Sequence, residues 1–457
     1  LYVIFYYEVN SSGLSFIKMK KLSRLVKNNS MSNIVWLMSD SIVRLGLGFI
    51  VSIWLARYLG PSDFGMFNYA YAMIAIYSAV ASLGMNGVVV RELVKGDVNP
   101  HTIMGTSFAL QIIGSLFACL LVVITVLILR PNDWNVMLVV LCMLPSVLLR
   151  SSDVVKYWFE SIVASKYTVW AQNVSFFISS LLKLLVIYYG GTYLEIAATV
   201  TIEALLVAIL LFFFYKKNND FKWNVNLLEA KRLFSISWPL VLSGVALMLY
   251  MRIDQIMIGN MIDDTAVGVY SVAVKMVEIW YFIPMAIVST LFPKIIKVKY
   301  LNEVEYNERL QVLYDILVYI SVFLALGVTL FSDIVIGILF DHQYDEASKL
   351  IKLYAWVSVF YFLSSASGRW YINEGLQKFA LNRNLLGLII GVILNYILIP
   401  LYGAIGSVYA TLIAYSCAGY FFDALSKRTR VAFYQKTKSF WLPGSFVRIK
   451  KHFLGKK

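Results

Sequence analysis

Ionisable side chains occur inside long apolar stretches of this sequence. Four of them are cations: Arg44, Lys183, Arg252 and Lys275. A charged side chain at the centre of a membrane helix costs about 2.5 to 3.5 kcal/mol on insertion scales, and those that persist usually face an interior cavity. A cavity with several cations suits an anionic group such as a phosphate or pyrophosphate, because Arg can bind it through two parallel hydrogen bonds.

Four acidic residues also interrupt the apolar stretches. They are Asp40, Glu203, Asp254 and Glu278. Asp40 precedes Arg44 by four residues, which is the favourable order for an ion pair on one helix face, and Lys275 precedes Glu278 by three. The four acids are candidates for binding a coupling proton or Na⁺ or for balancing charge. An equally good interpretation is that they only neutralise nearby cations and stabilise helix packing.

The composition indicates a membrane protein. The 457 residues are 60% hydrophobic and only 14% charged, with a mean hydropathy of +0.73, whereas a soluble protein has about 25% charged residues. The three cysteines lie in apolar runs without paired spacing, which predicts no disulfide framework. The three histidines are scattered and no phosphate-binding G-x-x-x-x-G-K-[ST] loop occurs. The sequence therefore predicts no metal site, no cofactor and no ATP hydrolysis.

Apolar windows predict about twelve membrane-spanning helices, each long enough to cross about 30 Å of hydrocarbon. The first six windows cover residues 34–56, 66–91, 105–129, 135–157, 168–189 and 193–215. The second six cover residues 234–259, 266–292, 311–332, 347–370, 382–400 and 404–425. The fold class predicted from this pattern is an all-α integral membrane protein. No loop is large enough to hold a separate soluble catalytic domain.

Lys and Arg residues concentrate in alternate loops, and this bias predicts that both termini are cytoplasmic. The net charge of +14 follows mainly from this bias and from a basic C-terminal tail, so it does not indicate nucleic-acid binding. The tail interleaves aromatic residues with cations, as a segment at a membrane surface does. Its charge would also favour anionic lipid headgroups.

Two weak matches indicate an internal repeat. A shift of 203 residues places Ser62–Ala70 on Thr265–Ala273, with Gly65 on Gly268, and a shift of 212 places Gly191 on Gly403. Similar shifts predict two pseudo-symmetric six-helix lobes in the same orientation, around a site near the middle of the membrane. The predicted domains are a cytoplasmic N-terminus at 1–33, an N-terminal lobe at 34–215, an inter-lobe loop at 216–233, a C-terminal lobe at 234–425 and a basic cytoplasmic tail at 426–457. Residues 1–18 are interpreted as an extension from an upstream start codon.

Several motifs resemble one family of membrane proteins. They are "SNIVWLMSDSIVRLG", "LARYLGPSDFGMFNYA" and "GMNGVVVRELVK" in the first two spans, "RIDQIMIGN" and "VGVYSVAVKMVE" in the seventh and eighth, and "IPLYGAIGSVYATLIAY" near the end. Together they resemble Wzx-type polysaccharide flippases of the multidrug/oligosaccharidyl-lipid/polysaccharide (MOP) exporter superfamily. The resemblance implies a fold like that of MATE and MurJ transporters, with Arg44 and Arg252 as members of a cationic cavity.

The function implied by this resemblance is transport rather than catalysis. An undecaprenyl-pyrophosphate-linked oligosaccharide would cross the bacterial cytoplasmic (inner) membrane by alternating access, for O-antigen, capsule or exopolysaccharide synthesis. Its pyrophosphate would meet the four buried cations while its polyprenyl chain stays in lipid, and a polysaccharide polymerase and a chain-length regulator would act beside it. Alternatives are a lipid II flippase or a multidrug cation antiporter of the same superfamily and, from a different class, a membrane polysaccharide polymerase or ligase.

Overall fold

The structure is a computed structural model that describes the backbone of residues 16–218, 222–299, 301–340 and 342–454. Side chains are described in the same ranges, except for residues 16–43, 218, 453 and 454. The described residues form α-helices and short 3₁₀-helices and no β-strand. Most of the stretch interpreted as an N-terminal extension, residues 1–15, lies outside the described residues.

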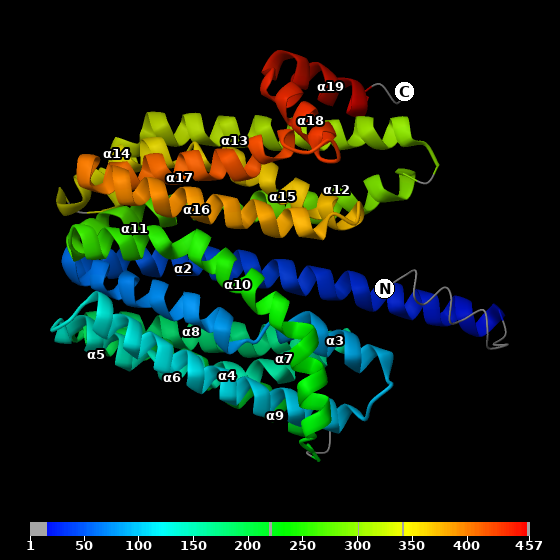
Figure 1. The fold of residues 1–457 in the computed structure, drawn as a ribbon, viewed down its shortest axis with the longest axis horizontal. Helices are drawn as coiled ribbons and strands as arrows, with labels where there is room; N and C mark the ends of the chain where they lie inside the picture. Colours follow the sequence, from blue (N-terminus) through cyan, green and yellow to red (C-terminus); the bar gives the residue numbers. More distant parts are fainter. Residues whose placement is uncertain (1–15, 219–221, 300, 341, 455–457) are drawn as a thin grey trace.

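The first half of the chain forms one layer of helices, drawn in blue and cyan in Figure 1. Its elements are α2 (Phe16–Ala81), α3 (Met85–Lys95), α4 (Pro100–Leu129), α5 (Trp134–Met143), α6 (Pro145–Leu149), η2 (Arg150–Ser152), α7 (Asp153–Ser161), α8 (Lys166–Tyr188) and α9 (Tyr193–Asn218). The predicted fourth span, 135–157, is therefore a broken helix. Pro145 begins the segment after the first break, where a proline lacks the N–H that a continuous helix would need.

The second half forms another layer, connected to the first through α10 and α11 (Figure 1). Its elements are α10 (Leu227–Met261), α11 (Asp264–Glu278), η3 (Ile279–Tyr281), α12 (Phe282–Lys299), α13 (Glu303–Leu339), η4 (His342–Tyr344), α14 (Asp345–Tyr354), α15 (Val357–Asn373), α16 (Gln377–Tyr402), α17 (Ala404–Gly419), η5 (Phe421–Ala424), α18 (Arg430–Phe440) and α19 (Leu442–Leu454). The two layers coincide with the two lobes that the repeat predicts, while the boundaries of these domains remain a prediction.

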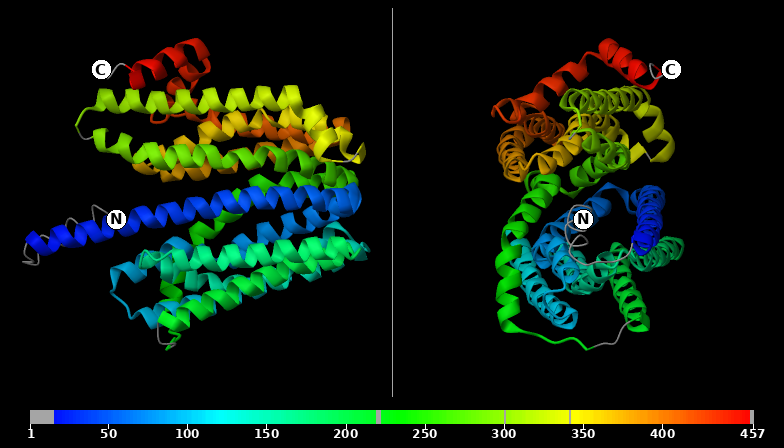
Figure 2. Two further views of the ribbon diagram at one scale, coloured as in Figure 1. Left: turned by 180° about the vertical axis from the view of Figure 1, so that it is seen from behind. Right: turned by 90° about the vertical axis from the view of Figure 1, so that its right-hand side faces the viewer.

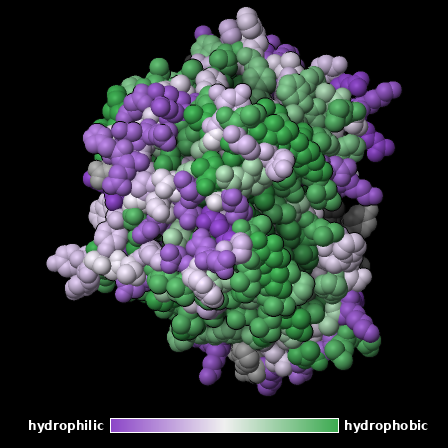
Figure 3. Space-filling model, turned by 60° about the vertical axis from the view of Figure 1, so that its left-hand side comes forward, coloured by the Kyte–Doolittle hydropathy of each residue, from purple (hydrophilic) through white to green (hydrophobic). Residues whose placement is uncertain are grey.

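In the part of the chain that the structure describes, ten helices are long and apolar enough to cross a membrane. The number is eleven if His342–Tyr354 and Val357–Asn373, which meet at a bend of 47°, form one span. The first of the ten, Arg44–Lys95, comprises the two parts of α2 that meet at Gly60, together with α3. The predicted count of twelve spans thus remains a prediction. Hydrophobic residues form a broad area on the face shown in Figure 3, as expected for a surface in lipid.

The chain reverses at Gly60, between the first two spans. Gly60 has φ 72° and ψ 172°, a backbone conformation that side chains with a Cβ rarely adopt. Pro61 follows at the start of the next helix, where its fixed φ is favourable. We call this end of the bundle the Gly60 end. The first turns of α2 and the last helix, α19, lie toward the opposite end (Figure 2), which we call the termini end.

The two halves pack closely at the Gly60 end. A Cβ atom added to Gly65 would lie 1.7 Å from the carbonyl oxygen of Asp264, and one added to Gly268 would lie 2.0 Å from that of Pro61. Only glycine permits such an approach of two backbones, as in the close helix packing of other membrane proteins. The glycines that the repeat aligns therefore meet each other's helices.

Arg130, at the C-terminal end of α4, connects the halves at the same end. Its guanidinium group donates to the Gly259 carbonyl oxygen at 2.5 Å and forms an ion pair with Asp264 at 2.8 Å. The group also lies over the ring of Tyr69, 4.5 Å from its centroid. Tyr69 in turn donates to Asn260 at 3.0 Å. These contacts close the Gly60 end of the bundle.

Candidate functional site

A cavity of about 610 Å³ lies between α2, α8, α9, α11 and the segment of η2 and α7. This volume is in the range of ordinary small-molecule sites. Along α2 the lining runs from Arg44 to Leu55 and resumes from Phe67 to Ala75. The cavity thus stops short of the Gly60 turn and extends toward the termini end.

The lining has more cations than carboxylates. Its cations are Arg44, Arg150, Lys156, Lys183 and Lys275, and its carboxylates are Asp153, Glu203 and Glu278. Among the ion pairs between described residues, none includes Arg44 or Lys275. Neither Arg44 nor Lys275 therefore has a carboxylate partner among the described side chains, and the same holds for Arg150 and Lys156, so the cavity favours an anion.

Lys275 is the cation that α11 contributes. Its ammonium group donates to the Ser52 hydroxyl oxygen at 3.1 Å and lies 4.6 Å from the centre of the Phe64 ring. A hydroxyl and an aromatic face hold the ammonium group in place without cancelling its charge. On α2, the Arg44 guanidinium lies 5.8 Å from the ring centre of Phe176.

Two ion pairs fix three further charged groups of the lining, Lys183, Glu203 and Glu278. Lys183 lies 3.8 Å from the Glu203 carboxylate and donates to the Ser179 hydroxyl at 3.2 Å. Arg252 lies 3.3 Å from the Glu278 carboxylate. The charge of Glu278 is thereby offset by an arginine on α10 that does not line the cavity. Glu203 and Glu278 thus each lie beside a cation, whereas Lys275 and Arg44 have no carboxylate beside them among the described side chains.

Five of the eight predicted site residues line this one cavity. They are Arg44, Lys183, Glu203, Lys275 and Glu278. Arg252 is not in the lining of this cavity and lies behind Glu278, with which it forms an ion pair. The side chain of Asp40 lies outside the described residues. The first half contributes most of the wall.

Three more charged residues, Arg150, Asp153 and Lys156, line the cavity and are not among the predicted site residues. They lie at the break between α6 and α7, on η2 and the first turn of α7. All three fall inside the predicted span 135–157, so a search for charges within that span would have found them.

Asp254 lies in the second half, apart from the large cavity. It is 6% exposed and accepts a hydrogen bond from the Tyr270 hydroxyl, which also contacts the Thr411 hydroxyl at 3.4 Å. Beside it is a small cavity of about 10 Å³, which has room for about one water-sized particle. The Asn395 side-chain oxygen that borders this cavity is buried and has no hydrogen-bond partner among the described residues.

The sequence matches the model of a known protein family. The family described as "Polysaccharide biosynthesis protein" matches residues 30–299, which is more than half of the chain. The chain belongs to the polysaccharide biosynthesis protein family. The MatE family also matches, over residues 239–397. Membership in this group of MOP-superfamily exporters confirms the resemblance of the motifs.

Two relatives of this family member have names that refer to glycans. "Probable low-salt glycan biosynthesis flippase Agl15" of Haloferax volcanii is 23% identical over 394 residues, which are 82% of this chain and 79% of the relative. "Capsular polysaccharide biosynthesis protein CapF" of Staphylococcus aureus is 22% identical over 378 residues, 79% of this chain and 89% of the relative. The relatives indicate a membrane transporter of polysaccharide biosynthesis rather than an enzyme.

Solved transporter structures share the fold. The lipid II flippase MurJ in an inward closed conformation has a TM-score of 0.68 at 14% identity, covering 92% of this chain and 93% of MurJ. An inward-facing MATE transporter of the MOP superfamily has a TM-score of 0.65 at 14% identity, covering 90% of this chain and 99% of the transporter. An outward-facing MATE transporter has a TM-score of 0.52 at 13% identity, covering 88% of this chain and 96% of the transporter. These structures therefore share the overall fold of this chain.

Proposed function

We propose that this protein moves an undecaprenyl-pyrophosphate-linked oligosaccharide across the bacterial cytoplasmic membrane by alternating access. The single observation that carries the proposal is the excess of cations in the lining of the large cavity. A diphosphate needs such a site, because its negative charges must exchange water for protein donors. In the proposed orientation the termini end faces the cytoplasm, so both termini are cytoplasmic, and the glycan emerges from the opposite, Gly60 end.

Different residues of the cavity lining bind different parts of the glycolipid. Arg44 and Lys275 engage the diphosphate, and Lys183 shifts from Glu203 toward it as the ligand enters. Amide and hydroxyl groups on α8, those of Gln172 and Ser180, also line the cavity and bind sugar hydroxyls. The polyprenyl chain remains in the lipid beside the bundle, since the cavity is too small for it. A polysaccharide polymerase and a chain-length regulator then act on the delivered glycan.

A reconstituted flipping assay tests this proposal. Vesicles contain the full-length protein and undecaprenyl diphosphate that carries a fluorescent sugar, and an impermeant reductant reports the label in the outer leaflet. We expect the reducible fraction to rise with time beyond that of protein-free vesicles. Parallel vesicles contain lipid II or are loaded with ethidium. Exchange of ethidium without movement of the glycolipid would contradict the proposal and favour a cation antiporter.

The alternatives differ in chemistry. A cation antiporter would need an acidic cavity, and the lining here has the opposite excess. A lipid II flippase would need the same cationic site. The flipping rate of lipid II, compared with that of the labelled undecaprenyl diphosphate glycolipid, therefore distinguishes this alternative. A polymerase or ligase would make a longer glycan, which electrophoresis of the recovered lipid would detect.

We also propose that Asp254 binds the coupling ion, H⁺ or Na⁺. Its carboxylate is buried, the adjoining cavity has room for one small particle, and the oxygen of Asn395 there lacks a donor. Replacement of Asp254 by Asn is expected to reduce flipping to the rate measured without an ion gradient, because the neutral amide binds neither a proton nor a cation strongly. The measurement is the flipping rate under an imposed pH gradient or an imposed Na⁺ gradient.

The matched control for this prediction is Asp345→Asn, which removes an exposed carboxylate from the first turn of α14. We expect this variant to keep the full response to the gradient. A response in Asp254→Asn equal to that of the unmodified protein would show that this carboxylate does not couple transport.

A further inference from the structure

The basic C-terminal tail forms two helices that are docked on the second half of the protein. Figure 2 shows α18 and α19 lying across the outside of the bundle, at a large angle to the long helices. They pack mainly against α13, and the Gln311 side chain donates to the Gln435 carbonyl oxygen at 3.0 Å. The tail is therefore a folded part of the protein with one side against the bundle and one side free.

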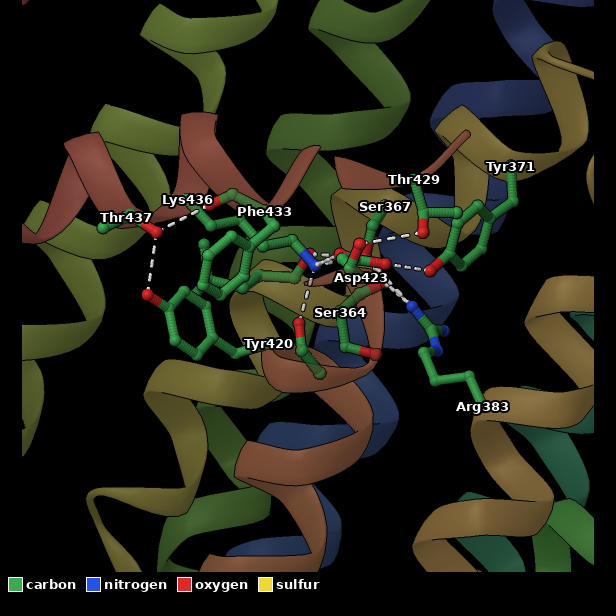
Figure 4. Close-up of polar contacts among 12 residues, drawn as sticks. Ser364, Ser367, Tyr371, Arg383, Tyr420, Asp423, Thr429, Phe433, Lys436 and Thr437 are labelled. Carbon is green, nitrogen blue, oxygen red and sulfur yellow. Dashed lines mark hydrogen bonds and ion pairs between the residues drawn. The ribbon is translucent and has the colours of Figure 1, made fainter. Parts of the chain in front are cut away.

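A buried ion pair fixes the position of α18. Lys436 and Asp423 are 2.6 Å apart, and both side chains are fully buried. The Lys436 ammonium also donates to the Gly419 carbonyl oxygen at 2.6 Å and to the Ser367 hydroxyl at 3.0 Å, while Tyr371 donates to Asp423 (Figure 4). Breaking such a pair by removing one partner is strongly destabilising, so α18 cannot easily leave the bundle.

A second ion pair fixes α19. Arg448 binds the buried carboxylate of Asp315 on α13 through two hydrogen bonds, of 2.7 and 2.8 Å. Ser445 donates to the same carboxylate at 3.2 Å. Thus Lys436 and Arg448 serve to hold the tail on the bundle, and other cations of the tail are free to act on its outer side.

The helices α18 and α19 contact α13 at one end of its apolar stretch. This helix has 37 residues, about 55 Å in length, whereas the hydrocarbon is about 30 Å thick. Residues 316–332 contain no charged side chain, and Asp315 and Asp333 bound them. The tail bonds to α13 between residues 307 and 315. It therefore lies where α13 leaves the hydrocarbon.

The outer face of α19 combines apolar and cationic residues. Phe446 and Val447 are 54% and 63% exposed, and Lys450 and Lys451 are also exposed. The spacing of four residues places each lysine beside one of the apolar residues on a single helix face.

The outer face of α18 has the same character. Val431, Tyr434 and Lys438 are exposed at spacings of three and four residues, and Trp441, just after the helix, is 68% exposed. Aromatic rings beside lysines are typical of helices that lie in the headgroup region of a membrane.

We propose that the outer face of α18 and α19 rests on the anionic lipid surface at the termini end and anchors the second half of the protein there. Charge complementarity supports this partner, because residues 427–457 contain ten Lys and Arg and no Asp or Glu. The rings of Trp441 and Phe446 enter the headgroup region, and the exposed lysines contact lipid phosphates. Each basic residue contributes about fivefold to partitioning onto such a surface.

Spin-label depth measurements test this inference on the full chain. The cysteines Cys119, Cys142 and Cys417 are replaced by Ala, and a nitroxide is attached at Val447→Cys. The protein is placed in nanodiscs of phosphatidylglycerol or of phosphatidylcholine, and collisions with lipid-soluble oxygen and a water-soluble nickel complex are compared. We expect oxygen collisions to dominate in phosphatidylglycerol and nickel collisions to increase in phosphatidylcholine.

A double charge reversal, Lys450→Glu with Lys451→Glu, is expected to weaken partitioning at least about 25-fold and to return the label to water in phosphatidylglycerol. The control is Lys216→Glu with Lys217→Glu, which changes two exposed lysines at the end of α9 and should leave the label in the headgroup region. A label that is equally aqueous in both lipids would overturn the proposal. So would a buried label that responds neither to the lipid nor to the charge reversal, since a contact other than anionic lipid would then cover this face.

Discussion

The double variant Arg44→Ala, Lys275→Ala is expected to lose about 100-fold or more of its glycan export. These two cations line the cavity without a carboxylate partner among the described side chains, so a diphosphate can engage them without first breaking a described ion pair. A hydrogen bond to a charged group contributes about 1.5 to 3 kcal/mol, and two such losses combine to this factor. The measurement is surface polysaccharide in a strain that lacks its own flippase, together with the vesicle assay described above.

The control for this experiment is the double variant Arg57→Ala, Lys349→Ala. It removes the same two residue types, one from each half, at exposed positions outside the cavity. We expect it to export normally, and the amount of each variant in the membrane is compared by gel filtration of a fluorescent fusion. Normal export by the cavity variant, at normal protein level, would rule out these cations as the diphosphate site.

Alanine at Gly65 or Gly268 is expected to prevent closure of the Gly60 end and to reduce transport severely. The added Cβ would meet backbone atoms of the opposite half at 1.7 or 2.0 Å. Backbone cannot move aside as a flexible side chain can, so the two halves must separate at this end. An additional cysteine at Ser52, in the cavity lining, then becomes accessible to an impermeant maleimide added from the Gly60 side.

The matched controls are Gly87→Ala and Gly327→Ala, one in each half. A Cβ at either glycine would meet nothing within 4 Å. We expect these variants to keep transport and to leave the cysteine protected from that side. Unchanged labelling and transport in Gly65→Ala would show that the glycine contact does not govern closure.

The helices and the turn between the first two spans could be predicted because they depend on local properties. A run of apolar residues must form a helix when it lies in lipid, since each backbone group needs a partner within the segment. Gly60 and Pro61 have conformational preferences that hold in any context. Breaks such as that at Pro145 and the bend between α14 and α15 depend on how neighbouring helices pack, and hydropathy does not report this.

The site could be predicted only in part. A charge in an apolar run indicates an interior position, and Arg44, Lys183 and Lys275 are indeed at the cavity. The rotation of each helix decides which interior space its side chains face, and this rotation follows from contacts between distant segments. For this reason Arg252 lies behind Glu278 and Asp254 lies in a separate small cavity.

Contacts between distant segments also decide which cations of the C-terminal tail are buried. Its charge and aromatic content predicted a segment at a membrane surface, but not which of its cations would be buried. Lys436 and Arg448 lie inside because Asp423 and Asp315 are there to bind them. Such pairs join segments that no periodic pattern connects.

The contact at Gly65 and Gly268 has the geometry of an interface between identical subunits. Gly65 meets Asp264, and Gly268 meets Pro61, so each glycine contacts the residue four positions before the other. In a twofold symmetric dimer every contact occurs twice in this reciprocal way. The single chain thus contains the equivalent of a homodimer interface, in which the two copies are covalently joined. Its two halves are free to differ elsewhere, and one has become the main wall of the cavity while the other holds the buried aspartate.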